Sequence, residues 1–346
     1  MEKKSQESQL RIGIVGCANV AKKYAIKAFH SIDNAKVVSI ASRDFGKAKE
    51  WAKQFGIQAD KSYDSLLERE DIDAVYIPLP IGLHEEWVMR SADAGKSVMC
   101  EKSLSDNFDS VARMIDFCKS KGVVLYENFM CDFHPQHAKI LSLISRGAIG
   151  NPFLFKGYFG FPQMDKNNFR YKKELGGGSL NDAGAYTVFM ARKILSNEPI
   201  AISSKLVMDG KMGVDVSGSA LLEFPEEKIA LLGFSFEAVY QNNYSVWGTK
   251  GLLKTDRAYS IPPGMKPPIE LVTNDGVQET VKHVEAPAAN HFELIFRDFC
   301  DTVLHKDNSG KHIEGIYAKI LSQAKTLEAM RISAKEKRRV EMKEIS

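Results

Sequence analysis

Two segments of the sequence carry side chains that can do acid–base chemistry on a polar substrate. Lys102 follows a short apolar run at 97–100, and a lysine there can hydrogen-bond a substrate oxygen and stabilise negative charge that develops on it. Asp182 and Tyr186 follow a glycine triplet and are four residues apart, so on a helix they project from one face. A tyrosine beside a cation has a lowered pKa and exchanges protons more readily near neutral pH. We therefore predict Tyr186 as a proton donor, Lys102 as the group that holds the oxygen, and Asp182 as the group that orients Lys102 or a substrate hydroxyl. A surface lysine and a core tyrosine are the alternatives.

A glycine-containing turn after the first apolar run indicates a dinucleotide. The sequence after residues 10–15 fits the pattern G-x-G-x-x-G/A as Gly16-x-Ala18-x-x-Ala21. Gly16 can make the tight turn, and Ala21 is small enough for close packing of helix on strand. The methyl group of Ala18 crowds the approach of a pyrophosphate without closing it. The predicted cofactor contacts of this loop are Gly16, Cys17, Ala18, Asn19 and Val20. A tight turn without a ligand is the alternative.

The end of the second apolar run distinguishes between the two nicotinamide cofactors. An acidic residue there would bind the ribose hydroxyl of NAD, whereas an arginine suits the 2′-phosphate of NADP. The sequence has Ser42 and Arg43, and a hydroxyl beside a guanidinium is a good phosphate clamp. Lys47 adds charge from the next turn, and Asp44 is the residue that could instead serve a ribose. We expect NADP (NADPH) as the cofactor.

The elements that must position these residues divide the chain in two. In the first part, short apolar runs alternate with amphipathic stretches, which is typical of βαβ units and a doubly wound parallel sheet. Strands are expected at 10–15, 35–42, 73–77, 97–100 and 123–127. Helices are expected at 20–31, 45–55, 83–94 and from 106 to before 122. Such a sheet binds ligands at the carboxyl ends of its strands, where the strand order reverses.

The second part has longer and more aromatic strands, which indicates an α+β domain with a mostly antiparallel open sheet. Strands are expected at 153–161, 200–209, 217–224, 229–237, 243–247 and 269–273, and helices at 137–145, 290–304 and 312–330. The charged residues 335–346 are expected to be a frayed end. We therefore predict a dinucleotide-binding domain with a doubly wound parallel sheet at 9–130 and an α+β domain at 131–335.

Composition excludes several classes of protein. The 346 residues carry 47 Lys and Arg against 44 Asp and Glu, a net charge of +3 that is too even for a nucleic-acid binder. No apolar run is long enough to span a membrane, and residues 1–9 are too polar for a secretory signal. The 5 cysteines form no CxxC or Cys/His cluster, so we expect free thiols, no metal and a cytoplasmic location.

Three motifs in this order resemble those of the glucose–fructose oxidoreductase, inositol dehydrogenase and MocA family. They are Glu101-Lys102, Glu127-Asn128-Phe129-Met130 and the run GGGSLNDAGAY at 176–186. The similarity covers about 9–330, and the family's EKP motif has Ser103 in place of its proline. The loop at 16–21, Ser42-Arg43 and the stretches 244–248 and 257–259 resemble one branch. That branch includes NADP-dependent nucleotide-sugar 3-ketoreductases, and also xylose and dihydrodiol dehydrogenases.

The resemblance implies a Rossmann domain at 9–130, an open sheet domain for substrate binding and oligomerisation at 131–335, and a sugar oxidoreductase. The expected substrate is a nucleotide-linked 3-keto sugar. The alternatives are a free sugar, polyol or dihydrodiol as substrate, or a dinucleotide-binding regulator without catalysis. The sheet of the second domain is expected to form a dimer or tetramer interface. The further cofactor contacts that the resemblance implies are Leu79, His84, Glu101, Lys102, Asn128 and Arg170.

Some of these residues also have a plainer interpretation. His84 could equally be a capping or core histidine, and Arg170 is open in the same way. His134 and His137 could touch substrate, but their spacing does not predict a metal site. The aromatic residues that could stack on a base or a sugar, or be ordinary sheet residues, are Phe159, Phe161, Phe169 and Tyr171.

Overall fold

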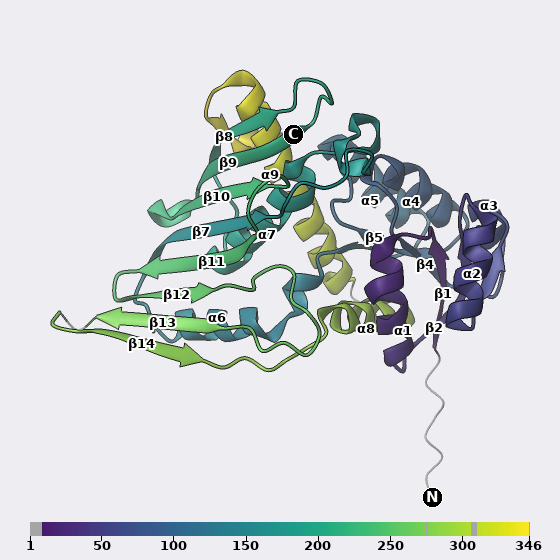
Figure 1. The fold of residues 1–346 in the computed structure, drawn as a ribbon, viewed down its shortest axis with the longest axis horizontal. Coiled ribbons are helices and arrows are strands. Elements are labelled where there is room, and N and C mark those ends of the chain that lie inside the picture. Colours follow the sequence, from purple (N-terminus) through teal and green to yellow (C-terminus); the bar gives the residue numbers. More distant parts are fainter. Residues whose placement is uncertain (1–8, 275, 306–309, 346) are drawn as a thin grey trace, which may run out of the picture. The chain divides into compact units, whose positions relative to one another are not determined.

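The computed structural model describes residues 9–274, 276–305 and 310–345 and divides the chain into two compact units. The first unit contains the chain up to Ser105, Asp109–Asn128 and Phe292–Leu321. The second contains Asp106–Phe108, Phe129–His291 and the chain from Ser322 onward. The last α-helix, α9 (Lys311–Glu336), thus has residues in both units (Figure 1). The two units therefore cannot be separated by one cut in the sequence.

A parallel sheet of six strands forms the centre of the first unit, in the order β3-β2-β1-β4-β5-β6. Its strands are β1 (Leu10–Val15), β2 (Ala35–Ala41), β3 (Gln58–Asp60), β4 (Ala74–Ile77), β5 (Ser97–Glu101) and β6 (Leu125–Asn128). The strand order reverses between β1 and β4, which is the point where doubly wound sheets bind ligands. The predicted fold class of this unit is confirmed.

Helices pack against both faces of this sheet, because right-handed crossovers on the two sides of β1 go to opposite faces. They are a π-helical turn (Ala21–Ala25), α1 (Ile26–Ser31), α2 (Phe45–Phe55), α3 (Tyr63–Leu67), α4 (His84–Asp93) and α5 (Phe108–Ser120). The helix α8 (His291–Leu304) joins them from the far end of the sequence: Phe296 stacks on Phe29 of α1 with ring centroids 4.0 Å apart. On the other side, Tyr63 of α3 meets Trp87 of α4 edge to face at 4.7 Å.

A sheet of nine strands forms the second unit, in the order β14-β13-β12-β11-β7-β10-β9-β8-β15. Its strands are β7 (Pro152–Gly160), β8 (Ala201–Met208), β9 (Asp215–Glu223), β10 (Ile229–Ser235), β11 (Gln241–Gly248), β12 (Gly251–Thr255), β13 (Ile269–Asn274), β14 (Glu279–Val284) and β15 (Val340–Glu341). All neighbours are antiparallel except β7 and β10. The predicted open antiparallel sheet is therefore confirmed.

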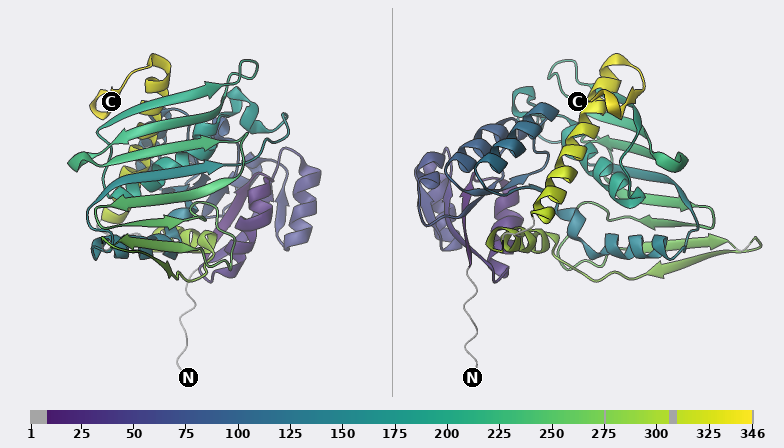
Figure 2. Two further views of the ribbon diagram at one scale, coloured as in Figure 1. Left: turned by 60° about the vertical axis from the view of Figure 1, so that its left-hand side comes forward. Right: turned by 180° about the vertical axis from the view of Figure 1, so that it is seen from behind.

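One face of this sheet carries the core of the unit. Along β7, Phe155 and Phe159 are buried whereas Tyr158 between them is exposed, and this alternation is that of a half-buried strand. The inner face is covered by α7 (Ala185–Leu195), which packs on β7 and β10. The remaining α-helices of the described residues are α6 (Pro135–Ser145) and α9 (Lys311–Glu336). Figure 2 shows the other face with no helix over it in the described part of the chain.

The prediction of a frayed end at 335–346 is wrong. The chain turns after α9 and Val340, which is fully buried, pairs with Ile202 of β8. Arg339 binds the carboxylate of Glu223 on β9 through two nitrogens at 2.6 and 2.8 Å. A charged composition is typical of a solvated tail. Here, however, the buried Val340 and the two hydrogen bonds from Arg339 to Glu223 hold this segment against the sheet as the short strand β15.

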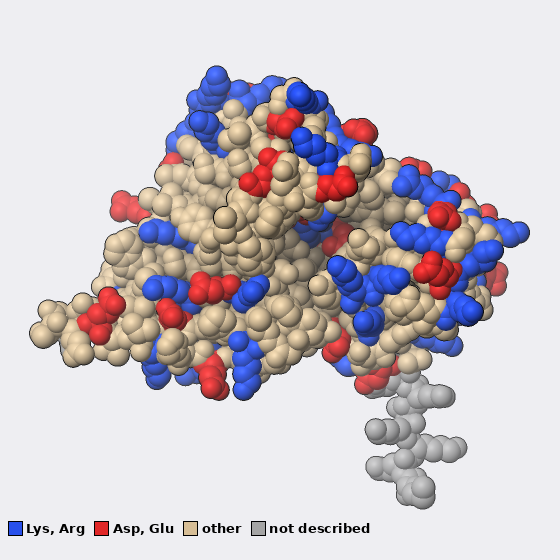
Figure 3. Space-filling model, viewed as in Figure 1, with Lys and Arg blue, Asp and Glu red and all other residues tan. Residues whose placement is uncertain are grey.

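Charges of both signs are mixed on the face of the molecule that Figure 3 shows. Lysines and arginines alternate with acidic side chains over the face shown in Figure 3, as the small net charge of +3 indicates. No helix in the described part of the chain is long and apolar enough to cross a membrane.

Candidate active site

The loop after β1 has the backbone geometry of a dinucleotide-binding turn. Gly16 has a φ of +123°, and a Cβ atom there would lie 2.8 Å from Cδ2 of Leu79, so only glycine fits. The Gly16 N–H donates to the carbonyl oxygen of Ala41 at 3.0 Å, which fixes the loop against the end of β2. The predicted loop residues and Leu79 thus come together at the reversal point of the sheet. Because residue 16 has no side chain, Leu79 packs directly on the backbone of the turn.

The end of β2 presents a basic and not an acidic side chain. Ser42 is buried and Arg43 is exposed, whereas Asp44 begins α2 by accepting a hydrogen bond from the Lys47 N–H at 3.1 Å. The Asp44 carboxylate is therefore used as a helix cap. Lys47 Nζ donates to the Cys17 carbonyl oxygen at 2.9 Å and lies 5.2 Å from the Trp51 ring. This cluster of cations beside the loop suits a phosphate group.

Glu101 and Asn128 are joined at the carboxyl ends of β5 and β6. The Glu101 Oε1 atom accepts hydrogen bonds from Asn128 Nδ2 and from the Tyr76 hydroxyl, each at 2.6 Å. Burial raises the pKa of Glu101, although both hydrogen bonds act in the opposite direction. Asn128 is fully buried, and its Oδ1 atom has no hydrogen-bond partner in the described residues. A buried acceptor at this edge fits a cofactor amide that donates to it.

Lys102 begins a loop whose backbone contacts the ring of His84. The Lys102–Ser103 peptide bond is cis. The fully buried ring of His84 has Nε2 at 2.8 Å from the Leu79 carbonyl oxygen and Nδ1 at 3.0 Å from that of Ser103. Burial lowers the pKa of His84, although the contacts with the backbone oxygens act in the opposite direction. His84 thus links the loop after β4 to the loop of Lys102, because its ring contacts a backbone carbonyl oxygen in each of them.

In the second unit, the glycine triplet is shaped by a residue that the sequence does not point to. Gly178 has a φ of +119°, and a Cβ atom there would lie 2.4 Å from Oδ1 of Asp215. The other oxygen of Asp215 accepts hydrogen bonds from the Ser179 hydroxyl at 2.6 Å and the Leu180 N–H at 2.7 Å. Asp215 thereby caps the helical segment that carries Asp182 and Tyr186. Asp215 is far from the glycine triplet in the sequence, so the sequence does not indicate this role. The position of β9 in the sheet brings Asp215 to Ser179 and Leu180.

Asp182 and Tyr186 lie on successive turns of one helical segment, as predicted. Asp182 is in a π-helical turn (Leu180–Gly184) and Tyr186 in the first turn of α7. The Asp182 carboxylate accepts hydrogen bonds from Arg170 Nε at 2.5 Å and Nη2 at 3.3 Å. Arg170 also lies close enough to Tyr186 for its charge to interact with the phenol. Arg170 and Asp182 thus form one polar pair beside Tyr186.

The Tyr186 ring is held among aromatic side chains and is 6% exposed. It meets Phe159 at 5.3 Å, Phe129 at 5.7 Å and Tyr259 at 6.1 Å between ring centroids. Its hydroxyl donates to the Met130 sulfur at 3.5 Å. A ring so fixed presents its hydroxyl in one orientation, which a proton donor requires.

His134 and His137 are part of the core and not of an open site. They are 1% and 0% exposed, and His137 lies with Nδ1 at 2.8 Å from the Tyr244 hydroxyl and Nε2 at 3.0 Å from the Ala258 carbonyl oxygen. Burial lowers the pKa of His134 to about 4. Within the described residues, no three His, Cys, Asp or Glu side chains are placed to hold a metal ion.

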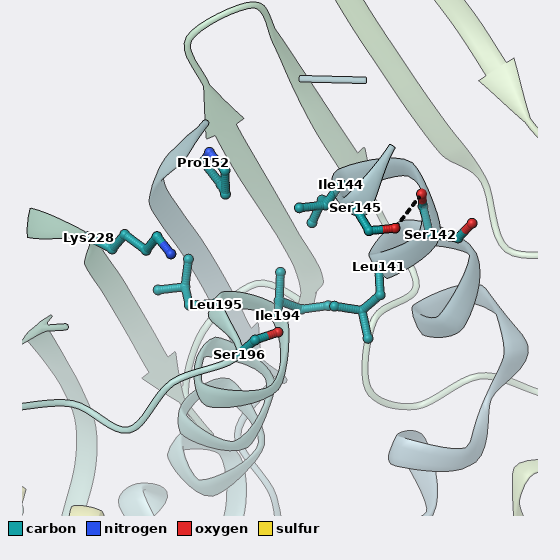
Figure 4. A pocket seen from close by; sticks show the side chains of 9 residues that line it. All are labelled: Leu141, Ser142, Ile144, Ser145, Pro152, Ile194, Leu195, Ser196 and Lys228. Carbon is teal, nitrogen blue, oxygen red and sulfur yellow. Dashed lines mark hydrogen bonds between the residues drawn. The ribbon is translucent and has the colours of Figure 1, made fainter. Parts of the chain in front are cut away.

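The second unit also has a hollow of about 490 Å³ at the ends of α6 and α7 (Figure 4). Its walls include Leu141, Ile194 and Leu195, with Lys228 at one side. None of the predicted catalytic or cofactor residues lines it. It therefore has no part in the candidate active site.

Comparisons with known proteins agree with this geometry. Residues 10–129 match the model of the GFO/IDH/MocA oxidoreductase family with an NAD-binding Rossmann fold, and residues 137–254 match the GFO/IDH/MocA C-terminal domain. The dTDP-3,4-didehydro-2,6-dideoxy-alpha-D-glucose 3-reductase of Streptomyces violaceoruber is 35% identical, covering 94% of this chain and 95% of its own. The D-xylose 1-dehydrogenase (NADP(+)) 2 of Haloferax volcanii is 35% identical over 73% of this chain and 78% of its own.

A solved structure resembles this chain over 94% of its length. It is KijD10, a 3-ketoreductase from Actinomadura kijaniata, in complex with NADP and TDP-benzene. The two chains are 33% identical with a TM-score of 0.89, covering 94% of this chain and 98% of that one. Both family models and a relative matched over nearly its full length thus bear out the resemblance carried by the motifs around Lys102 and Tyr186. The chain belongs to the GFO/IDH/MocA family of oxidoreductases.

Proposed function

We propose that this protein uses NADPH to reduce the keto group of a sugar, and that this sugar is a nucleotide-linked 3-keto deoxysugar. The observation that carries the proposal is the similarity along 94% of the chain to a dTDP-sugar 3-reductase. The likeness to a 3-ketoreductase structure that holds NADP and TDP-benzene supports the same substrate class. The arginine at the end of β2 supports NADP over NAD.

In this proposal the groups of the two units have separate roles. When bound, the reduced nicotinamide supplies a hydride to the carbonyl carbon. Lys102 donates a hydrogen bond to the carbonyl oxygen and stabilises the negative charge that develops there. Tyr186 then gives its phenolic proton to the alkoxide oxygen. Asp182 keeps Arg170 beside Tyr186, and this cation favours the phenolate that proton transfer leaves behind.

Most of the cofactor contacts predicted from the sequence keep that role in the proposal, whereas Leu79, His84 and Arg170 act indirectly. The loop from Gly16 to Val20 takes the pyrophosphate, and Ser42 and Arg43 take the 2′-phosphate. Glu101 and Asn128 face the nicotinamide, with the free Asn128 Oδ1 accepting from its carboxamide. Leu79 packs against the loop, and His84 acts by holding the Lys102 loop. Arg170, paired with Asp182, contributes its charge to Tyr186.

A dehydrogenase of a free sugar, polyol or dihydrodiol is the second candidate, favoured by the match to a D-xylose 1-dehydrogenase. A regulator without catalysis is disfavoured, because such a protein has no need of both Lys102 and Tyr186. The test is the ratio of kcat/KM on a TDP-linked 3-keto sugar to that on the free sugar. We expect the linked substrate to be favoured, because binding of the remote nucleotide can position the reacting carbon. Equal efficiency on a free aldose would support the second candidate instead.

We also propose a homo-oligomer, a dimer or tetramer, that is formed through the uncovered face of the large sheet. Tyr158 and Trp247 on this face are 42% and 48% exposed, and exposed aromatic side chains are typical of interfaces. Sedimentation of the wild type and of Trp247→Glu tests this, since a monomeric wild type would contradict it. The cysteines are free thiols in the described residues, which supports the cytoplasm as the compartment.

A further inference from the structure

An exposed tyrosine near the Tyr186 site is held in a fixed position. Tyr240 follows β10 just before β11, and its side chain is 41% exposed. Its hydroxyl accepts a hydrogen bond from Asn242 Nδ2 at 2.9 Å and another from Arg257 Nη1 at 3.0 Å. Exposed tyrosines usually keep rotational freedom, and two hydrogen bonds remove it here. The ring is thus ready to receive a ligand at little entropic cost.

Asn242 is the buried support of this tyrosine. It is 2% exposed, and its Oδ1 atom accepts hydrogen bonds from the N–H groups of Ala258 at 3.1 Å and Tyr259 at 2.7 Å. Its amide nitrogen also donates to the Ser260 carbonyl oxygen at 2.8 Å. One buried amide therefore fixes both the turn at 258–260 and the Tyr240 hydroxyl.

Arg257 adds an unneutralised positive charge to the same place. Its guanidinium carbon lies 5.3 Å from the centroid of the Tyr240 ring, a cation–π distance. No carboxylate of the described residues lies within 4.0 Å of its nitrogens, whereas most arginines of the second unit have one. An arginine with unused donors in a fork geometry is well suited to a phosphate group.

Contacts within the unit connect this pair to Tyr186. The Tyr259 ring lies 6.1 Å from that of Tyr186 and 5.2 Å from that of Phe159. Phe159 on β7 is paired with Asn242 on β11, and both side chains are buried on the inner face of the sheet. Asn242 bonds both the Tyr240 hydroxyl and the Tyr259 N–H, so this one side chain connects Tyr240 to the residue whose ring meets that of Tyr186.

We infer that Tyr240 and Arg257 form the subsite for the nucleoside diphosphate of the substrate, with the base stacked on Tyr240 and the diphosphate paired with Arg257. The inference rests on the proposed function and extends it from the reacting sugar to the nucleotide. In this assignment Tyr186 serves the sugar, Arg257 the diphosphate and Tyr240 the base, and the contact between Arg257 and Tyr240 matches the adjacency of diphosphate and nucleoside in such a substrate. Of the aromatic residues that the sequence offered for stacking, Phe159 and Tyr171 are buried, and the Tyr171 hydroxyl is bound to Glu237.

The experiment is calorimetric titration of the NADP-bound protein with thymidine 5′-diphosphate and with thymidine. Tyr240→Ala should weaken both ligands at least tenfold, because base stacking is lost. Arg257→Gln should weaken the diphosphate at least tenfold and thymidine less than threefold. Tyr240→Phe keeps the ring face but loses the two hydrogen bonds that fix it, so its affinity for both ligands should fall between those of the wild type and of Tyr240→Ala.

Matched controls separate this inference from the proposed function. Tyr24→Ala removes a tyrosine that is equally exposed, at 42%, and Arg146→Gln removes another arginine of the second unit; both should leave diphosphate affinity unchanged. NADP affinity should be unchanged in Tyr240→Ala and Arg257→Gln, which shows that these variants are folded. If the wild type binds the diphosphate and these two variants bind it within twofold, the subsite is refuted and the proposed function stands. If the wild type does not bind the diphosphate at all, the nucleotide-linked substrate itself is refuted.

Discussion

Replacing Tyr186 with phenylalanine tests the central step of the proposed mechanism with little change to the fold. The ring contacts to Phe129, Phe159 and Tyr259 do not involve the hydroxyl and persist in the variant. The hydroxyl donates to the Met130 sulfur at 3.5 Å, and sulfur is a weak acceptor, so losing this bond costs less than about 1 kcal/mol of stability. The melting temperature should therefore fall by less than about 4 °C.

Turnover should fall far more than stability. General acid catalysis contributes about 10²–10⁴-fold, which corresponds to roughly 2.7–5.4 kcal/mol of transition-state stabilisation. The assay is steady-state oxidation of NADPH with a keto sugar, with NADP affinity measured in parallel and expected to be unchanged. A deuterated cofactor shows whether hydride transfer limits the rate.

The control is Tyr259→Phe, which removes a neighbouring buried hydroxyl that donates to the Asn243 carbonyl oxygen at 3.1 Å. Its turnover should stay within threefold of the wild type. If Tyr186→Phe keeps more than about a third of wild-type turnover while hydride transfer limits the rate, the phenol is not the acid. A water molecule or a substrate hydroxyl would then deliver the proton.

Three further predictions concern the cofactor, the core and the glycine loop. The wild type should bind NADP at least tenfold more tightly than NAD, a difference of about 1.4 kcal/mol, and Arg43→Ala should remove most of this preference. Titration followed by nicotinamide fluorescence measures both affinities, and equal affinities in the wild type would contradict the prediction. Burial lowers the pKa of His134 to about 4 and of His291 to about 3, so the unfolded chain takes up protons first as the pH falls below about 6.5. Stability should thus drop by about 2 kcal/mol for each histidine between pH 7 and pH 5, and a urea midpoint that is flat over this range would contradict this. Gly178→Ala should cost about 1–3 kcal/mol because of its positive φ and its contact with Asp215, and the same urea titration measures it.

The fold was largely accessible from the sequence because its signals are local. The apolar runs at 10–15 and 97–100 have the length and spacing of buried parallel strands, and they form β1 and β5. The short elements β3 and α3 were missed, because three to five residues carry too little periodicity. The end of the chain was missed for another reason, since β15 depends on pairing with a strand well over a hundred residues away.

The candidate site was accessible where motifs are contiguous and not where contacts are long-range. Glycines such as Gly16 mark positions that only glycine can occupy, so the cofactor turn is visible in the sequence. The pairing of Arg170 with Asp182 and the support of Gly178 by Asp215 arise from the folding of separate segments onto one another. No spacing rule predicts such contacts. The burial of His84 under the Lys102 loop belongs to the same class.

The short strand β15 has a consequence for handling this protein. It covers part of the outer edge of β8, where Val207 and Met208 are already 48% and 56% exposed. An uncovered edge offers unpaired N–H and C=O groups to other chains and is a site of intermolecular sheet extension. Removing residues 338–345 would lengthen this open edge and favour aggregation at high concentration. A purification tag is therefore better attached before residue 9 than directly after β15.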